Sequence, residues 1–189
     1  MKNKLILILS LVFSLFMLIL FIVYLIKDDS SRWQVALGGI AVSALPLFML
    51  FVKKNPFSVL IYISYYIFLF CTTCLGSILS FYMKYKWWDS TLHFYKGLLM
   101  GFIAISLFKF LVPVRSQRDV SKWIPFIFIF SLAVTASVIW EIYEFTGDLF
   151  FTHTMQRGGN RDTMYDLLCG TAGGLLTAIY FSIKTKKPG

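Results

Sequence analysis

Six ionisable side chains lie near the ends of three long apolar segments in the second half of the chain. They are Asp89, His93, Glu141, Glu144, Asp162 and Asp166. Carboxylates together with an imidazole can hold a hard divalent cation through oxygen and nitrogen atoms. Crowded carboxylates can instead raise one another's pKa values, which gives a proton donor beside an ionised acceptor. The pattern therefore predicts metal-assisted or acid–base chemistry, or proton movement.

Two of these segments begin with the same spacing of polar residues and glycines. The pattern is Asp-x3-(His or Asp)-x3-Gly-x3-Gly, and it starts at Asp89 and again at Asp162. Residues four apart share one face of a helix, and glycines at that spacing let two backbones approach closely. We expect these two helices to pack side by side, with their polar residues together at one end.

The composition is typical of a membrane protein. Hydrophobic residues make up 58% of the chain and charged residues 14%. A membrane span needs about 20 apolar residues. The sequence predicts an all-α, polytopic membrane helix bundle with six transmembrane helices in a single domain, 1–189. The helices are expected at about 5–26, 35–52, 57–82, 91–112, 123–147 and 163–183.

The positive charges predict the orientation of the spans. The net charge is +9, and short cytoplasmic loops of membrane proteins are enriched in Lys and Arg. Their distribution favours cytoplasmic termini in a bacterial cytoplasmic membrane, which places the polar residues at the outer ends of helices four to six. No soluble basic domain is evident, so a nucleic-acid partner is not expected.

Depth along the helices suggests separate roles for the polar residues. At a rise of about 1.5 Å per residue, His93, Glu144 and Asp166 lie about 6 Å below the helix ends, and Glu141 lies deeper still. We expect Glu141 and Asp166 to be the central catalytic groups, with His93 and Glu144 assisting them. His93 would serve as a ligand or a proton shuttle.

The remaining polar residues have both functional and structural interpretations. A divalent metal ion is a possible cofactor, with Asp89, His93, Glu141, Glu144, Asp162 and Asp166 as hypothetical ligands. Asp89 and Asp162 could instead cap their helices. Lys96 is interpreted as a counter-ion or substrate-binding residue, and Arg161 as a group that binds an anionic head group or flanks the membrane.

Residues 87–176 resemble a known group of membrane proteins. The resemblance is carried by Asp89-x3-His93, by Glu141-x-x-Glu144, and by a third motif that contains Arg161, Asp162 and Asp166 and is followed by two glycines. This combination is similar to the YjdF-type family of bacterial membrane proteins and, more distantly, to the VanZ-type family associated with glycopeptide resistance. Cys169 departs from the Asn of many VanZ-type chains, which favours the YjdF-type assignment. The resemblance implies a fold and polar positions, but no reaction.

Three classes of function stay open from the sequence. The first is a protein that acts on a membrane lipid or a lipid-linked envelope substrate through a metal ion or shared protons. The second is a proton-coupled transporter or permease, although the inner halves of helices four to six are mostly apolar. The third is a non-catalytic protein that binds envelope components. The sequence does not indicate an oligomeric state.

The charge bias makes a testable prediction about topology. In a chain whose three native cysteines are replaced, His153→Cys should react with a membrane-impermeant thiol reagent in intact cells. Labelling only in permeabilised cells would contradict this orientation and show that the polar residues lie on the cytoplasmic side.

Overall fold

A computed structural model describes residues 1–150, 155–156 and 159–184, and this part of the chain is all-α, without strands. Six of its helices are long and apolar enough to cross a membrane, which confirms the predicted fold class. They are Lys2–Ile26, Ser30–Leu50, Val59–Ile78, Trp88–Leu111, Trp123–Phe150 and Asn160–Lys184. The orientation of the termini stays a prediction, and His153 lies outside the described residues.

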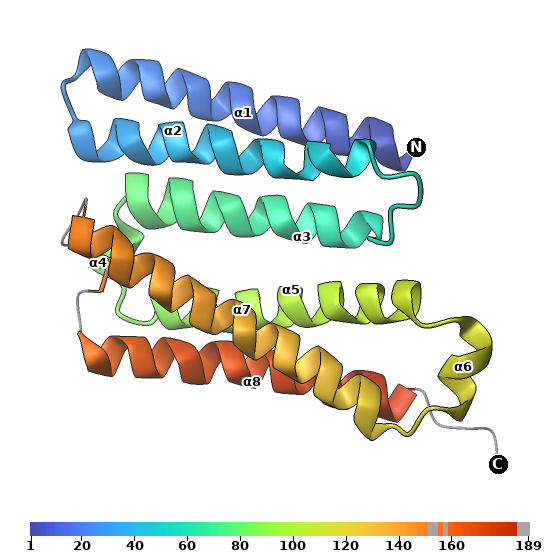
Figure 1. Cartoon of the computed structure of the whole chain (residues 1–189). Coiled ribbons are helices and arrows are strands. Elements are labelled where there is room, and N and C mark those ends of the chain that lie inside the picture. The colour runs from blue at the N-terminus through green and yellow to red at the C-terminus, as the bar shows by residue number, and fades with distance from the viewer. Residues whose placement is uncertain (151–154, 157–158, 185–189) are drawn as a thin grey trace. The chain divides into compact units, whose positions relative to one another are not determined.

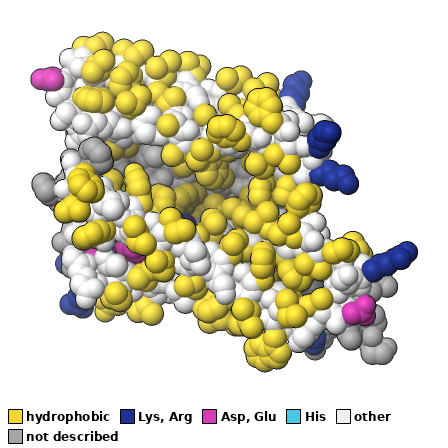
Figure 2. Space-filling view, viewed as in Figure 1, with side chains coloured by type: hydrophobic (Ala, Val, Ile, Leu, Met, Phe, Trp, Pro, Cys, Tyr) yellow, Lys and Arg dark blue, Asp and Glu magenta, His cyan; other side chains and the backbone are white. Residues whose placement is uncertain are grey.

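Apolar side chains cover the outer surfaces of these helices. Leu11, Phe110, Ile139 and Leu168 are examples of large hydrophobic residues that are exposed along the spans. In Figure 2, hydrophobic side chains spread over most of the visible face, and the visible Lys and Arg side chains lie mainly toward helix ends. Such surfaces suit contact with lipid, where a helix pairs its backbone polar groups internally.

The chain divides into two compact units, Met1–Trp88 and Asp89–Gly189. The predicted single domain stays a prediction. The first unit contains α1 (Lys2–Ile26), α2 (Ser30–Ala44) with its 3₁₀ continuation η1 (Leu45–Leu50), α3 (Val59–Leu69) with its π-helical continuation η2 (Phe70–Ile78), and the short α4 (Phe81–Lys84) (Figure 1).

Buried hydroxyl groups connect the helices of the first unit. The Tyr66 hydroxyl donates to the backbone carbonyl of Ser43 at 2.8 Å and accepts from Ser10 Oγ at 2.6 Å. The rings and side chains of Phe13, Met17 and Tyr66 belong to the same buried core. The buried hydroxyls of Ser10 and Tyr66 therefore have hydrogen-bond partners within the protein, as buried polar groups usually do.

The third span ends earlier than the predicted 57–82. Its helix stops at Ile78, and Ser80 has a left-handed backbone with φ of +60° that turns the chain into α4. Arg32 Nε donates to the carbonyl oxygen of Ile78 at 2.9 Å and ties this turn to the start of α2. Hydrogen bonds from Arg32 hold the pKa of Asp29, the N-cap of α2, below its usual range.

The second unit positions the polar residues. It contains α5 (Trp88–Leu111), α6 (Val114–Asp119), α7 (Trp123–Phe150) and α8 (Asn160–Lys184) (Figure 1). At one end of the three long helices, an apolar core joins all of them; its buried members are Ala104, Ile105, Phe108, Ile129, Ala178 and Phe181.

Glycines allow α5 and α8 to touch through their backbones, as the repeated spacing predicts. A Cβ placed on Gly97 would collide with the carbonyl oxygen of Gly170, and one on Gly173 would collide with the carbonyl oxygen of Phe94. Farther along, a Cβ on Gly101 would collide with the side chain of Thr177. Both sequences advance in the same direction along this contact, so the two helices run parallel and their polar starts meet.

This contact predicts that a glycine-to-alanine change within it lowers stability, whereas the same change at an open position does not. Gly97→Ala should lower the free energy of unfolding by about 1–3 kcal/mol, because a backbone carbonyl cannot move aside without shifting a helix. Gly38→Ala is the matched control, since nothing lies within 4 Å of its added Cβ. That change should be neutral or stabilise by up to about 1 kcal/mol through helix propensity. Thermal unfolding in detergent measures both, and equal melting temperatures would contradict the close helix contact.

Candidate functional site

His93 lies among four carboxylates, and these five ionisable side chains come from three helices. Asp89 is on α5 with His93, Glu141 and Glu144 are on α7, and Asp166 is on α8. We call these five residues the His93 cluster. The parallel contact of α5 and α8 brings their first turns together, and the antiparallel α7 adds its last turns.

The two ring nitrogens of His93 face different carboxylates. Nε2 lies 3.4 Å from Asp89 Oδ1 and 4.0 Å from Glu144 Oε1. Nδ1 lies 3.2 Å from Glu141 Oε1 and 3.2 Å from Lys96 Nζ. The imidazole therefore lies between Asp89 and Glu144 on one side and Glu141 on the other, and Lys96 approaches the nitrogen that faces Glu141.

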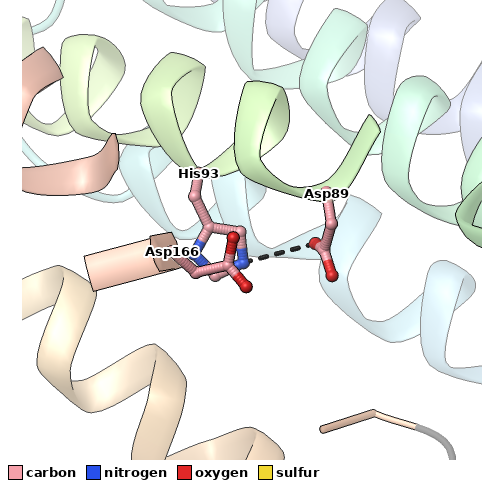
Figure 3. A group of neighbouring side chains, drawn as sticks. All are labelled: Asp89, His93 and Asp166. Carbon is pink, nitrogen blue, oxygen red and sulfur yellow. Dashed lines mark ion pairs between the residues drawn. The ribbon is translucent and has the colours of Figure 1, made fainter. Parts of the chain in front are cut away.

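Two overlapping sets of these side chains are spaced to hold a metal ion. One set is Asp89, His93 and Asp166, and the other is His93, Glu141 and Glu144. Within each set, one potential ligand atom from each residue lies within 4.8 Å of the others. Figure 3 shows the first set: the Asp166 carboxylate overlaps the His93 ring in this view, Asp89 lies beside the ring, and a dashed line marks the ion pair between His93 and Asp89.

Burial varies across the His93 cluster and leaves one side open. His93, Glu141 and Asp166 are only 3%, 5% and 2% exposed. The side chains of Asp89 and Glu144 are 28% and 15% exposed. Charges buried in low-dielectric surroundings require compensation. The buried carboxylates of Glu141 and Asp166, when ionised, thus need a counter-charge, and the partly exposed residues mark the side from which a ligand would enter.

Glu141 is the least satisfied acid in the described part of the chain. Neither of its carboxylate oxygens accepts a hydrogen bond, although both are buried. His93 Nδ1 lies 3.2 Å from Glu141 Oε1, and that contact has an ion-pair distance without hydrogen-bond geometry. Buried polar atoms almost always have partners. A carboxylate left in this state points to a group that the protein itself does not supply.

Trp140 and Lys96 form a second layer around the carboxylates of α7. The Trp140 indole Nε1 donates to Glu144 Oε1 at 2.7 Å. Lys96 is buried, and its Nζ lies 4.7 Å from the centre of the Trp140 ring, which is a cation–π distance. Lys96 Nζ also lies 3.2 Å from His93 Nδ1, and the tautomer of His93 decides whether this nitrogen accepts from the ammonium or donates to Glu141.

Asp166 is fixed from the neighbouring helix. Ser90 Oγ on α5 donates to Asp166 Oδ1 at 3.0 Å. The contact pairs one carboxylate oxygen across the α5–α8 interface and directs the acid toward the cluster. Ser90 follows Asp89 directly in the sequence, so the two side chains leave α5 in different directions. The Ser90 hydroxyl reaches Asp166 on α8, and the Asp89 carboxylate faces His93.

Two predicted site residues lie outside the candidate ligand sets. Asp162 is half-buried on the first turn of α8 and belongs to neither metal-holding set. Arg161 is exposed, with its guanidinium 5.6 Å from the centre of the Tyr165 ring. Their roles as a ligand and as a head-group-binding residue stay predictions.

Small residues close the space beneath the cluster. One turn deeper than Glu141 on α7, Ser137 faces Gly170, because a Cβ on Gly170 would collide with Ser137 Oγ. The Ser137 hydroxyl is buried and has no hydrogen-bond partner among the described residues. Another turn deeper, a Cβ on Gly174 would come 2.6 Å from that of Ala133. The last polar group below Glu141 on this face is therefore a serine, followed by close apolar packing.

Three residues of the site were not predicted to belong to it: Trp140, Ser90 and Ser137. The spacing contained part of the signal. Trp140 and Ser137 lie four residues before Glu144 and Glu141, so each shares a helix face with one of the acids. Tryptophan and serine are common in membrane helices as lipid-facing or packing residues, and spacing alone does not separate these roles.

Together, the spans and the His93 cluster define a multi-pass membrane protein with carboxylates and a histidine inside its membrane-spanning helices. Residues 8–187 match a family described as "Predicted membrane protein (DUF2238)", and the chain belongs to this family. The narrower resemblance to the YjdF-type and VanZ-type families stays a prediction.

The chain is also similar to a curated bacterial protein. An uncharacterised protein of Thermotoga maritima is 33% identical over 106 residues. The alignment covers 55% of this chain and 52% of the Thermotoga protein, so the chain matches about half the length of that relative. No solved structure matches the chain.

The lack of donors around Glu141 predicts how the metal-free protein responds to neutralisation. Glu141→Gln should raise the free energy of unfolding by about 1–3 kcal/mol, because a neutral amide of similar shape replaces a buried carboxylate without partners. Glu144→Gln is the comparison, since Glu144 is more exposed and accepts the Trp140 hydrogen bond. The free energy of unfolding should rise by less in this variant. Thermal unfolding in detergent with a chelator measures both. A lower stability for Glu141→Gln would show that this carboxylate is already compensated within the protein.

Proposed function

We propose that this protein binds a divalent cation in the His93 cluster and uses it to hold or act on an anionic head group at the surface of the bacterial cytoplasmic membrane. The substrate would be an envelope lipid or a lipid-linked precursor. In this proposal, Glu141, Glu144, Asp89 and Asp166 supply oxygen ligands and His93 supplies nitrogen.

The buried, unpartnered carboxylate of Glu141 carries this proposal. The His93 cluster contains four carboxylates, and Lys96 adds one positive charge, so with neutral His93 the formal sum is −3. A divalent cation reduces that excess to −1 and provides the partner that Glu141 lacks. Mixed carboxylate and imidazole ligands suit cations such as Mn²⁺ or Zn²⁺ better than Ca²⁺, which takes oxygen ligands.

The depth of the cluster supports an amphiphilic substrate. At about 1.5 Å per residue, His93 lies about 8 Å from the start of α5, and Asp166 about 9 Å from the start of α8. α5 is about 36 Å long, against about 30 Å for a bilayer's hydrocarbon core. The cluster therefore lies close to the boundary where head groups meet hydrocarbon. Exposed Arg161, near the start of α8, would attract an anionic head group to this level.

The apolar packing below the cluster favours this proposal over transport. Ser137 and Gly170 are followed by the Ala133–Gly174 contact and then by the core that contains Ile129. Thr177 does not extend a polar path, because its hydroxyl donates to the Gly174 carbonyl oxygen of its own helix at 2.8 Å. A proton or ion that enters at the cluster thus meets packed apolar side chains within the second unit.

The proposal predicts metal in the purified protein. Wild type should retain close to one equivalent of a divalent transition metal after extraction from membranes. The double variant Glu141→Gln with Asp166→Asn should retain less than about a tenth of that amount, because two ligands lose their charge. Elemental analysis by mass spectrometry measures the content, and Asp119→Asn, an exposed acid on α6, is the control.

The same preparation tests the head-group part of the proposal. Phosphate-bearing lipids that co-purify with wild type should be lost on chelation and should be fewer in Arg161→Gln. Equal metal content in wild type and the double variant would refute the metal site. Metal binding without any metal-dependent lipid would refute the proposed substrate class alone.

A further inference from the structure

Lys96 Nζ lies 3.2 Å from the same His93 nitrogen that faces Glu141. We infer that its ammonium group is a built-in competitor for the divalent cation, so that metal binding and the Lys96–His93 contact exclude each other. This inference rests on the proposed function, because it concerns how the same site is loaded.

The geometry of Nδ1 sets up the competition. Lys96 Nζ and Glu141 Oε1 both lie 3.2 Å from His93 Nδ1. When His93 is neutral with its proton on Nε2, the ammonium donates to the one lone pair of Nδ1, and a metal ion bound by Nδ1 and Glu141 would use that same lone pair. The Nδ1 lone pair can bind either the ammonium or the metal ion, but not both at once. A bound metal therefore requires Lys96 Nζ to move away from the imidazole.

The Trp140 ring provides the lysine with a second contact. Lys96 Nζ lies 4.7 Å from the ring centre, so the ammonium can keep its cation–π contact after it leaves His93. The same indole donates to Glu144, the other α7 acid of the proposed site. Displacement of the lysine is thereby coupled to a ring that also positions a metal ligand.

A resident ammonium has a clear physical use in this site. Without metal, four carboxylates and one histidine pack together inside membrane helices, and their repulsion opposes folding. Lys96 supplies one positive charge during folding and insertion. The same charge then opposes a second cation at short range, so the metal binds more weakly than the ligand set alone would allow.

The experiment removes the ammonium and keeps the side-chain volume. Mn²⁺ is titrated into metal-free wild type, Lys96→Met and Lys109→Met in lipid nanodiscs, and free Mn²⁺ is followed by electron paramagnetic resonance. Lys109 is the matched control, because it lies on the same helix and places its Nζ 5.4 Å from the Phe181 ring, at the opposite end. Lys96→Met should bind Mn²⁺ at least about tenfold more tightly, because a unit charge within a few ångströms of the cation is removed. Lys109→Met should match wild type.

Each outcome separates the inference from the proposed function. Wild type that binds Mn²⁺ with the same or higher affinity than Lys96→Met overturns the competition and leaves the metal site intact. No binding in any of the three proteins removes the metal site, and the competition falls with it. A folding defect in Lys96→Met would weaken binding, so tighter binding is an outcome that misfolding does not produce. Melting curves of the metal-free proteins check that all three are folded.

Discussion

The backbone contact between α5 and α8 is the constraint on which the candidate site depends. Gly97 and Gly173 lie against carbonyl groups of the opposite helix, so a single added methyl group on either would force the helices apart. Parallel helices at this separation place Asp166 beside His93 and within reach of the Ser90 hydroxyl. The glycines carry no chemistry themselves, but they set the distance at which the acids interact.

The short separation creates an electrostatic problem as well as a site. Carboxylates in adjacent helices repel one another, and the apolar surroundings weaken the solvation that would offset this repulsion. The second unit meets part of the problem with its own groups: Ser90 donates to Asp166, Trp140 donates to Glu144, and Lys96 adds a positive charge. Glu141 receives no hydrogen bond. This remaining imbalance is the physical basis for proposing a cation, because stability alone gives no reason to bury such a group.

Along α7, the partly exposed Glu144 and the close packing at Ser137 and Ala133 lie on opposite sides of Glu141. Asp89, in the first turn of α5, and Glu144, one turn past Glu141 on α7, retain partial exposure. In the other direction along α7, Ser137 is followed by Ala133 and Ile129. A binding or catalytic site needs one entrance, and a transport path needs two that open in turn. The packing thus agrees with the proposed chemistry at one membrane surface, in which a head group would enter beside a bound metal ion while its acyl chains stay in lipid.

The sequence by itself determined the all-α class, the six spans and the gathering of the acids at one end of three helices, because apolar length and the helical repeat are local properties. It also indicated the α5–α8 contact, since glycines at four-residue spacing have few other uses in membrane helices. Only the tertiary structure showed that Glu141 lacks a donor, that Lys96 contacts His93 and Trp140, and that Arg161 is exposed. Those outcomes depend on how each helix is rotated about its axis. Packing against the neighbouring helices decides that rotation, and the spacing of residues along one helix does not contain it.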